Sequence, residues 1–181
     1  MKYRLKKVAV LGSGIMGSGI ACHLANVGME VLMLDILSKE QGEDKLSRDS
    51  VVNKALQTAI KSKPAPLYDK KFVNLIKTGN FQDDFEKVSE ADWIIEVVVE
   101  RLEIKKRILE KVDQFRRETS LVSSNTSSIP IKLLAEGRSK SFKSHFCGTH
   151  FFNPVRYLRL LEVIPTKETL KEVTNFFIDF G

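Results

Sequence analysis

The sequence is poor in cysteine and histidine. Cys22 and Cys147 are its two cysteines, and together with the three histidines they do not form a Cys/His cluster of the kind that binds zinc. A disulfide-stapled scaffold and a zinc ribbon are therefore excluded, and no metal site is predicted. Because so few cysteines suit a reducing compartment, a cytoplasmic location is expected.

Long apolar runs, internal repeats and low-complexity segments are missing as well. No stretch reaches the roughly 18 apolar residues of a membrane span, so none is predicted. With 43% hydrophobic and 29% charged residues among 181, the composition is that of one globular domain, which excludes a disordered tail or a coiled-coil rod. The net charge of +6 is moderate and suits a ligand that carries phosphate. The basic residues are not interleaved with aromatic ones, so nucleic-acid binding is not predicted.

A glycine-rich turn follows the first apolar stretch of the chain. Lys7–Leu11 has the β-branched composition of a buried strand, and Gly12–Gly17 then spells G-x-G-x-x-G at the start of the helical pattern Ile15–Val27. Glu30–Leu34 is a second apolar strand and is followed at once by Asp35. A strand, a helix and a strand within about 30 residues form a βαβ unit with parallel strands. In this context the turn predicts a dinucleotide site.

Each residue of this motif has a physical role at such a site. Gly12 allows the tight turn, Gly14 lets a pyrophosphate approach the backbone, and Gly17 lets the helix pack close to the strand. The carboxylate of Asp35 can accept hydrogen bonds from the ribose hydroxyls and would repel a 2′-phosphate, which favours NAD over NADP. The alternative is a glycine-rich turn that binds no ligand. The predicted cofactor-binding residues of the motif are Gly12, Gly14, Ile15, Met16, Gly17 and Asp35.

The alternation of strands and helices is interrupted between about residues 38 and 80. Leu46–Lys63 has a helical apolar stripe that ends at Pro64 and Pro66, and Leu67–Ile76 is expected to form another helix. The segment holds nine Lys or Arg against five Asp or Glu, a local excess of four positive charges. A helical pair inserted here would project from the sheet as a basic arm. The alternative is an ordinary solvated helix face.

Strands and helices alternate again in the second half of the chain. The composition predicts strands at Asp92–Val99, Ser120–Ser123, His145–Phe151 and Tyr157–Ile164, and helices at Leu102–Phe115, Pro130–Ala135 and from a Thr166 cap to Phe180. We therefore predict an α/β fold of the Rossmann type, in which a mostly parallel sheet has helices on both faces and an inserted helical arm after its second strand.

A histidine and a glutamate are candidates for the chemical centre. His150 ends a predicted strand, where ligands of open parallel sheets bind, and an imidazole suits a general base near neutral pH. Glu162 is the sole acid between residues 137 and 166, and a carboxylate beside the imidazole would stabilise the imidazolium. The spacing alone also allows a structural salt bridge. His23, on the first helix, is expected to be a partly buried structural residue, and His145 to be solvated.

The run Ser124–Ser128 places short hydrogen-bonding side chains after another predicted strand. One interpretation is loop and cap chemistry before Pro130. The other is that a hydroxyl of this run binds an oxygen atom of the substrate.

Five separated motifs now stand in order along the chain: Gly12–Gly17, Asp92–Glu100 (DWIIEVVVE), Ser124–Ser128 (SNTSS), His150–Pro154 (HFFNP) and Leu160–Ile164 (LLEVI). Over essentially the whole chain these motifs resemble the L-3-hydroxyacyl-CoA dehydrogenase family. The chain looks most like the N-terminal dehydrogenase segment of long bacterial proteins that also carry an enoyl-CoA hydratase-like region.

This resemblance implies an activity, the NAD-dependent oxidation of an L-3-hydroxyacyl-CoA to a 3-ketoacyl-CoA in fatty-acid β-oxidation. It also implies roles for individual residues. These are His150 as the base, Glu162 as its partner, Ser127 bonded to the 3-oxygen of the substrate, Asn153 near nicotinamide and substrate, and Glu100 and Lys105 lining the cofactor cleft.

The basic arm is similar to a helical projection of the family that contacts coenzyme A. Ala55 stands where members of the family often present a serine, and the arm lysine that binds the substrate would be Lys61 or Lys63, with Ser62 at the aligned site. Residues 1–181 would then form the NAD-binding dehydrogenase domain. The helical C-terminal domain of the family, which supplies another active-site asparagine and most of the dimer contact, is absent after Gly181.

The partners implied are an acyl-CoA substrate, that missing domain, a fused hydratase region and a second subunit of a homodimer. Two other interpretations stay open. One is an NAD-binding module that is inactive without its C-terminal domain, and the other is a related dehydrogenase that acts on a free 3-hydroxy acid.

Overall fold

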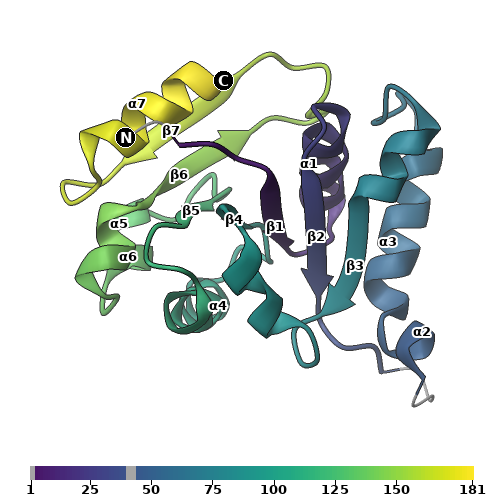
Figure 1. The fold of residues 1–181 in the computed structure, drawn as a ribbon, viewed down its shortest axis with the longest axis horizontal. Helices are drawn as coiled ribbons and strands as arrows, with labels where there is room; N and C mark the ends of the chain where they lie inside the picture. The colour runs from purple at the N-terminus through teal and green to yellow at the C-terminus, as the bar shows by residue number, and fades with distance from the viewer. Residues whose placement is uncertain (1–2, 40–43) are drawn as a thin grey trace.

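A seven-stranded sheet forms the centre of the molecule (Figure 1). The computed structural model describes residues 3–39 and 44–181, so residues 1–2 of the predicted domain and 40–43 of the predicted arm lie outside the described part. Along the sheet the strand order is β3-β2-β1-β4-β5-β6-β7. The strands are β1 (Lys7–Leu11), β2 (Glu30–Asp35), β3 (Ile76–Asn80), β4 (Trp93–Glu96), β5 (Leu121–Ser124), β6 (Phe146–Phe151) and β7 (Leu161–Pro165). Neighbouring strands run parallel except β6 and β7, which confirms the predicted Rossmann-type sheet.

Helices cover both faces of the sheet, as predicted. One face carries α1 (Ile15–Asn26), α3 (Ser50–Lys61) and α7 (Lys171–Phe180). The other face carries the 3₁₀ helix η2 (Phe85–Glu90), α4 (Leu102–Phe115), α5 (Ile131–Ala135) and α6 (Lys140–Ser144). Strand β1 shows why both faces must be covered. Val8 and Val10 pack on one side and Ala9 and Leu11 on the other, and none of the four is more than 1% exposed.

The structure corrects the prediction for the end of the insertion. The helix expected at Leu67–Ile76 is only the 3₁₀ helix η1 (Lys70–Leu75), and Ile76–Asn80 is a strand that was not predicted. This strand, β3, pairs in parallel with β2 and so forms hydrogen bonds with backbone groups of β2 that would otherwise lie at the edge of the sheet. The insertion is therefore a crossover that returns to the sheet.

The helical part of the insertion is present but packs on the rest of the domain. It comprises the short helix α2 (Lys45–Arg48) and then α3, which contacts α1, β2 and β3 and buries Val52 and Leu56. The insertion after β2 is thus helical, as predicted, but α3 does not project from the sheet as an arm, because its apolar stripe is part of the core.

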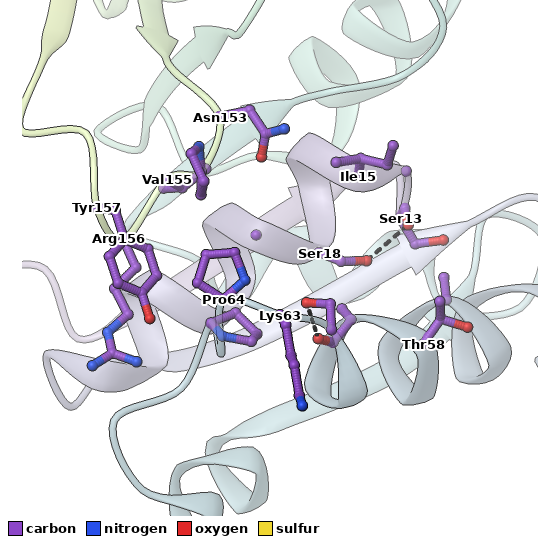
Figure 2. Close-up of a pocket in the computed structure, with 17 residues that line it drawn as sticks. Ser13, Ile15, Ser18, Thr58, Lys63, Pro64, Asn153, Val155, Arg156 and Tyr157 are labelled. Atoms are coloured by element: carbon purple, nitrogen blue, oxygen red, sulfur yellow. Dashed lines mark hydrogen bonds between the residues drawn. The ribbon is translucent and has the colours of Figure 1, made fainter.

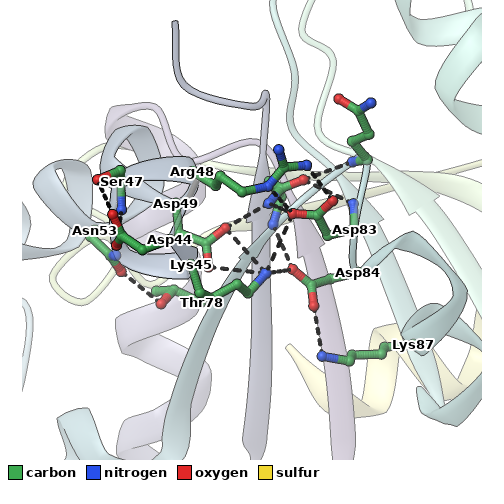
Figure 3. A network of polar contacts seen from close by, with 12 residues as sticks. Asp44, Lys45, Ser47, Arg48, Asp49, Asn53, Thr78, Asp83, Asp84 and Lys87 are labelled. Carbon is green, nitrogen blue, oxygen red and sulfur yellow. Dashed lines mark hydrogen bonds and ion pairs between the residues drawn. The ribbon is translucent and has the colours of Figure 1, made fainter. Parts of the chain in front are cut away.

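A network of charged side chains holds α2 against the loop that follows β3 (Figure 3). Lys45 Nζ lies 3.1 Å from the carboxylate of Asp49 and also pairs with Asp84, while Arg48 pairs with Asp83 at 2.5 Å. The Arg48 guanidinium lowers the pKa of Asp83 well below its usual range. These contacts join two loops at the carboxyl ends of β2 and β3, where the predicted site lies.

Two predictions near the C-terminus also need correction. The strand expected from Tyr157 begins only at Leu161, and α7 begins at Lys171 rather than after a Thr166 cap. The hydroxyl of Thr166 instead accepts a hydrogen bond from Glu168 N, and Thr169 Oγ1 donates to Phe146 O. These hydroxyls build a turn against the start of β6, and Leu170 caps α7 without a side-chain hydrogen bond.

His23 has the structural position expected for it, and its burial predicts a pH dependence. It packs edge-on against Phe151, its Nδ1 is buried without a hydrogen bond within the described ranges, and burial lowers its pKa below 6.5. As the pH falls below about 6.5, the unfolded chain takes up this proton more readily than the folded one, so stability decreases. We expect the free energy of unfolding to fall by up to about 1.4 kcal/mol per pH unit on this account.

Urea unfolding of the wild type and of His23→Leu at pH 7 and pH 5 measures this effect. The apolar variant should lose less stability over that interval. Equal losses in the two proteins would contradict the assignment of the pH dependence to His23.

Among the described residues, no helix combines the length and the hydrophobicity that crossing a bilayer requires.

Candidate active site

The glycine-rich turn lies between β1 and α1. Two of its glycines are required by close packing, and the third lies beside open space. Gly12 has φ of +111°, and a Cβ atom there would lie 2.6 Å from Val97 O. A Cβ on Gly17 would lie 1.9 Å from Gly12 O. Both glycines are therefore required by the fold itself. At Gly14, in contrast, φ is −59° and an added Cβ would meet nothing within 4 Å.

The space above Gly14 faces the N-terminal end of α1. This helix has Gly14 as its N-cap, with no side-chain hydrogen bond to its first amides and no acidic residue in its first turn. Ile15 is 80% exposed there. Uncapped amides at a helix N-terminus attract an anion, and a glycine that neither backbone nor packing requires leaves room for one. The residues present thus fit the pyrophosphate of a dinucleotide.

Asp35 ends β2 beside this turn. Its Oδ2 accepts hydrogen bonds from Ser13 N (2.6 Å) and Ser13 Oγ (2.5 Å), and its Oδ1 accepts one from Ile36 N (2.6 Å). The carboxylate is thus fixed against the glycine-rich turn, as the prediction for a ribose-binding acid requires. Its negative charge disfavours the 2′-phosphate of NADP.

Removing this carboxylate is expected to weaken NAD binding. Because a hydrogen bond to a charged group contributes about 1.5–3 kcal/mol, Asp35→Ala should reduce NAD affinity by roughly 10- to 100-fold in isothermal titration. A thermal melt of the variant serves as the control, since the substitution also removes three internal hydrogen bonds. Unchanged affinity in a folded variant would contradict the ribose role.

The imidazole and the carboxylate proposed for the chemistry are in contact. His150 on β6 and Glu162 on β7 are partners in the antiparallel register, and Nδ1 of His150 lies 2.7 Å from Oε2 of Glu162. Their side chains are 18% and 51% exposed. The ring of Phe152 lies beside the imidazole, with 4.5 Å between centroids. Since His150 makes no other hydrogen bond in the described part of the chain, its Nε2 is available to a ligand.

A cavity of about 300 Å³ in front of His150 gathers residues from the carboxyl ends of four strands, β1, β4, β5 and β6, and the segments that follow them. It connects the glycine-rich turn with the ends of β4, β5 and β6. Predicted site residues that line it are Met16, Glu100, Lys105, Ser127, His150 and Asn153, and Asn125 and Phe152 also contribute.

Within the serine-rich run, only one hydroxyl is left for a ligand. Ser124 Oγ donates to Glu96, and the hydroxyls of Thr126 and Ser128 both donate to Glu100. Ser127 is exposed, lines the cavity and makes no hydrogen bond within the described residues. Loop and cap chemistry thus accounts for most of the run, and Ser127 is the hydroxyl that can bond a substrate oxygen.

A buried lysine holds the β4 end of this cavity. Lys105 is 1% exposed, and its Nζ lies 2.8 Å from Glu96 Oε1 and 3.1 Å from Glu100 Oε2. Burial raises the pKa of Glu96, and Lys105 opposes that effect. Although burial would raise the pKa of Glu100, hydrogen bonding to Thr126 and the charge of Lys105 lower it to about 2. Glu96 was not predicted, although an acid inside an apolar strand was a signal for a buried ion pair.

A second, larger cavity of about 520 Å³ lies on the other side of Asn153, which lines both (Figure 2). Its walls are the glycine-rich turn at Ser13 and Gly14, the first turns of α1, the end of α3 with the loop after it, and the loop after β6. Lys63 and Ser62 are among the lining residues, as is Ala55. Lys61, the other arm lysine predicted to bind substrate, is not among them.

The domain thus combines a glycine-rich turn that suits a dinucleotide with a histidine–glutamate pair, and its sequence matches a known family. The sequence profile of a family described as "3-hydroxyacyl-CoA dehydrogenase, NAD binding domain" matches residues 7–181. The chain belongs to this family. Its cofactor is NAD, as the open space above Gly14 and the position of Asp35 also indicate.

Relatives of this NAD-binding domain carry matching names. Over its full length it is 53% identical to a "Probable 3-hydroxyacyl-CoA dehydrogenase" from Bacillus subtilis, of which it covers 24%. Over 99% of its length it is 33% identical to the mitochondrial "Hydroxyacyl-coenzyme A dehydrogenase" of Sus scrofa, of which it covers 57%. The chain therefore spans between about a quarter and a little over half of these relatives. The predicted resemblance to the family is confirmed.

The solved structures agree in fold. The crystal structure of 3-hydroxybutyryl-CoA dehydrogenase from Escherichia coli matches 98% of this domain with a TM-score of 0.75 at 28% identity, and the domain covers 36% of that chain.

Proposed function

We propose that the protein oxidises an L-3-hydroxyacyl-CoA to the 3-ketoacyl-CoA with NAD, as a step of fatty-acid β-oxidation. The observation that carries this proposal is the 2.7 Å contact between His150 Nδ1 and Glu162, at a cavity that also reaches Met16 of the glycine-rich turn. A base held by a carboxylate beside a dinucleotide site is the arrangement that oxidation of a hydroxyl group requires.

The residues at the smaller cavity, together with Glu162 behind His150, have separate roles in this reaction. NAD, when bound, supplies the acceptor for a hydride. Glu162 accepts the Nδ1–H of His150, which leaves the lone pair of Nε2 to take the proton of the 3-hydroxyl group. The same carboxylate stabilises the imidazolium that results. Ser127 and Asn153 donate hydrogen bonds to the substrate oxygen and so orient the reacting carbon.

The larger cavity is the route proposed for the acyl-CoA. Its volume of about 520 Å³ is within the usual range for small-molecule sites, and it meets the smaller cavity at Asn153. Of the two arm lysines, Lys63 is the one assigned to coenzyme A, because it lines this cavity and Lys61 does not.

The proposal extends to partners and location. Relatives roughly two to four times longer support further segments as partners; the family resemblance implies that these are a helical C-terminal domain and a fused hydratase region, with a homodimer as the assembly. Both cysteines are buried free thiols, which supports a cytoplasmic location.

Consumption of NADH with acetoacetyl-CoA, measured for this chain and for a longer parent protein, tests the proposal. Turnover by the longer protein alone, with NAD binding by both, would mean that the domain is inactive without its C-terminal partner. Equal rates with free acetoacetate and with acetoacetyl-CoA would instead identify a dehydrogenase of free 3-hydroxy acids. Loss of turnover in both proteins would contradict the proposed reaction.

A further inference from the structure

One wall of the larger cavity has no regular secondary structure of its own. It belongs to the connection between the end of α3 and η1, residues 64–68, of which Pro64 and Pro66 line the cavity. The carbonyl groups of Ala65, Pro66 and Leu67 have no strand or helix to bond them. Each accepts a hydrogen bond from a side chain elsewhere in the chain. The position of this wall therefore depends on those side chains.

Arg156 is the principal donor to the wall, and it comes from the loop after β6, which lies beside Pro64 (Figure 2). Its Nη1 donates to Ala65 O at 2.7 Å and to Leu67 O at 3.0 Å. Its guanidinium carbon lies 4.1 Å from the ring centroid of Tyr68 and 5.0 Å from that of Tyr157. The planar group thus packs near two aromatic rings while it bonds two carbonyls.

Two neighbouring contacts support the same arrangement. Tyr157 Oη donates to Ala65 O at 3.0 Å, and Asn26 at the end of α1 bonds both Pro66 O and Tyr68 N at 2.8 Å. Asn26 belongs to the same side of the domain as the wall, however. Arg156 and Tyr157 are the residues that join the wall to the loop carrying Asn153.

The charge of Arg156 is not used in an ion pair. No carboxylate lies within salt-bridge distance of it in the described part of the chain. Its contacts depend on the fork of N–H groups and on the flat face of the guanidinium, which a lysine ammonium does not reproduce. Replacing Arg156 with lysine therefore removes these contacts while it keeps the positive charge.

The loop that carries Arg156 also carries Asn153, three residues earlier. Between them Val155 is buried against Gly19 of α1, where an added Cβ would lie 3.2 Å from it. Asn153 is thus held on one side by β6 and on the other by Val155 and Arg156. Since Asn153 lies where the two cavities meet, the Arg156 contacts set both the width of the larger cavity and the place of its junction with the smaller one.

We propose that Arg156 is a positioning residue for the acyl-CoA substrate. It joins residues 65–67 to the loop that carries Asn153 and keeps the larger cavity at the width that the acyl-CoA thioester needs. The glycine-rich turn lines the same cavity at Ser13 and Gly14, but among the described residues Arg156 makes no hydrogen bond to it, so the role is assigned to acyl-CoA binding and not to NAD binding. The inference rests on the proposed function, because it concerns the site assigned there to acyl-CoA.

Titration of the full-length protein with acetoacetyl-CoA and, separately, with NADH tests this inference. Arg156→Ala is expected to weaken acetoacetyl-CoA binding about tenfold. Arg156→Lys should weaken it at least about threefold, because a lysine keeps the charge but lacks the planar guanidinium that bonds both carbonyls and packs near both tyrosine rings. NADH affinity should stay within about twofold of the wild type in both variants. Arg159→Ala is the matched control. That arginine is exposed, lies in the same loop and makes no hydrogen bond or ion pair among the described residues, so its loss should leave both affinities within about twofold.

The outcomes separate the inference from the proposed function. Wild-type affinity for acetoacetyl-CoA in Arg156→Lys would mean that charge alone matters and would overturn the positioning role. A lower melting temperature of Arg156→Ala with unchanged acetoacetyl-CoA binding would reduce the residue to a structural one and overturn it as well. Binding of NADH without any binding of acetoacetyl-CoA by the wild type would overturn both the proposed substrate and this inference.

Discussion

Replacing His150 with glutamine is expected to reduce kcat by roughly 10²- to 10⁴-fold, the contribution typical of a general base. Glutamine can keep a hydrogen bond to Glu162 and has a similar size, so the cavity should stay intact. The affinity for NADH should change by less than about twofold, since His150 lies outside the glycine-rich turn. Steady-state kinetics with acetoacetyl-CoA and NADH, together with titration of NADH, measure both quantities.

The matched control is His145→Gln, at the other end of the same strand. His145 Nδ1 lies 2.9 Å from Ser141 O and 3.0 Å from Ser144 Oγ, far from both cavities along β6. Its replacement should leave kcat within about twofold. Equal loss of turnover in the two variants, or loss of NADH binding by His150→Gln in parallel with kcat, would remove His150 from the role of the base.

The second and third glycines of the G-x-G-x-x-G turn, Gly14 and Gly17, are expected to respond differently to alanine. In Gly17→Ala the Cβ would lie 1.9 Å from Gly12 O, so helix α1 must move away from β1. Overpacking of this kind costs about 2 kcal/mol or more, which corresponds to a melting temperature lower by on the order of 5 °C. Binding of NAD should be lost as well, because the helix end is displaced.

Gly14→Ala should separate these two effects. Its φ of −59° suits alanine and no atom lies within 4 Å of the added Cβ, so the melting temperature should stay within about 2 °C. The methyl group would nevertheless occupy the space proposed for the pyrophosphate, so NAD affinity should fall at least about tenfold. Differential scanning fluorimetry and isothermal titration give the two readouts. A Gly14→Ala protein that binds NAD like the wild type would place the pyrophosphate elsewhere.

Much of the sheet could be predicted because its central strands are apolar on both faces. Strands β1 and β4 each lie between two helical layers, so nearly every residue in them must be hydrophobic, and this is visible in the sequence. Strand β3 could not be recognised in this way. Its sequence, IKTGN, includes an exposed lysine and a glycine, and the strand exists because it pairs with β2 at the edge of the sheet. The apolar residues before it suggested a helix instead.

The site was predictable to a similar extent and for a similar reason. His150 and Glu162 could be paired because the ends of neighbouring strands meet at one edge, and the contact between them is present. Ser127 could be distinguished from the other hydroxyls of its run only when the structure showed those hydroxyls bonded to Glu96 and Glu100. The contacts of Arg156 could not be predicted at all. They are made with backbone carbonyls of a distant loop, and because every residue has a backbone carbonyl, the sequence does not show which ones are bonded.

The antiparallel pairing of β6 with β7 has a consequence for how this domain can change. His150 faces Glu162 across a ladder in which Phe151 also faces Leu161, so backbone hydrogen bonds fix their separation and the connecting residues 152–160 do not. Beyond Asn153, that connection can be lengthened, shortened or exchanged for another while the proposed base and its carboxylate stay together. An insertion of one residue inside either strand would turn one of the two side chains to the opposite face. Substrate preference and proton transfer can therefore be engineered independently on this scaffold, the first by loop exchange and the second by point substitution.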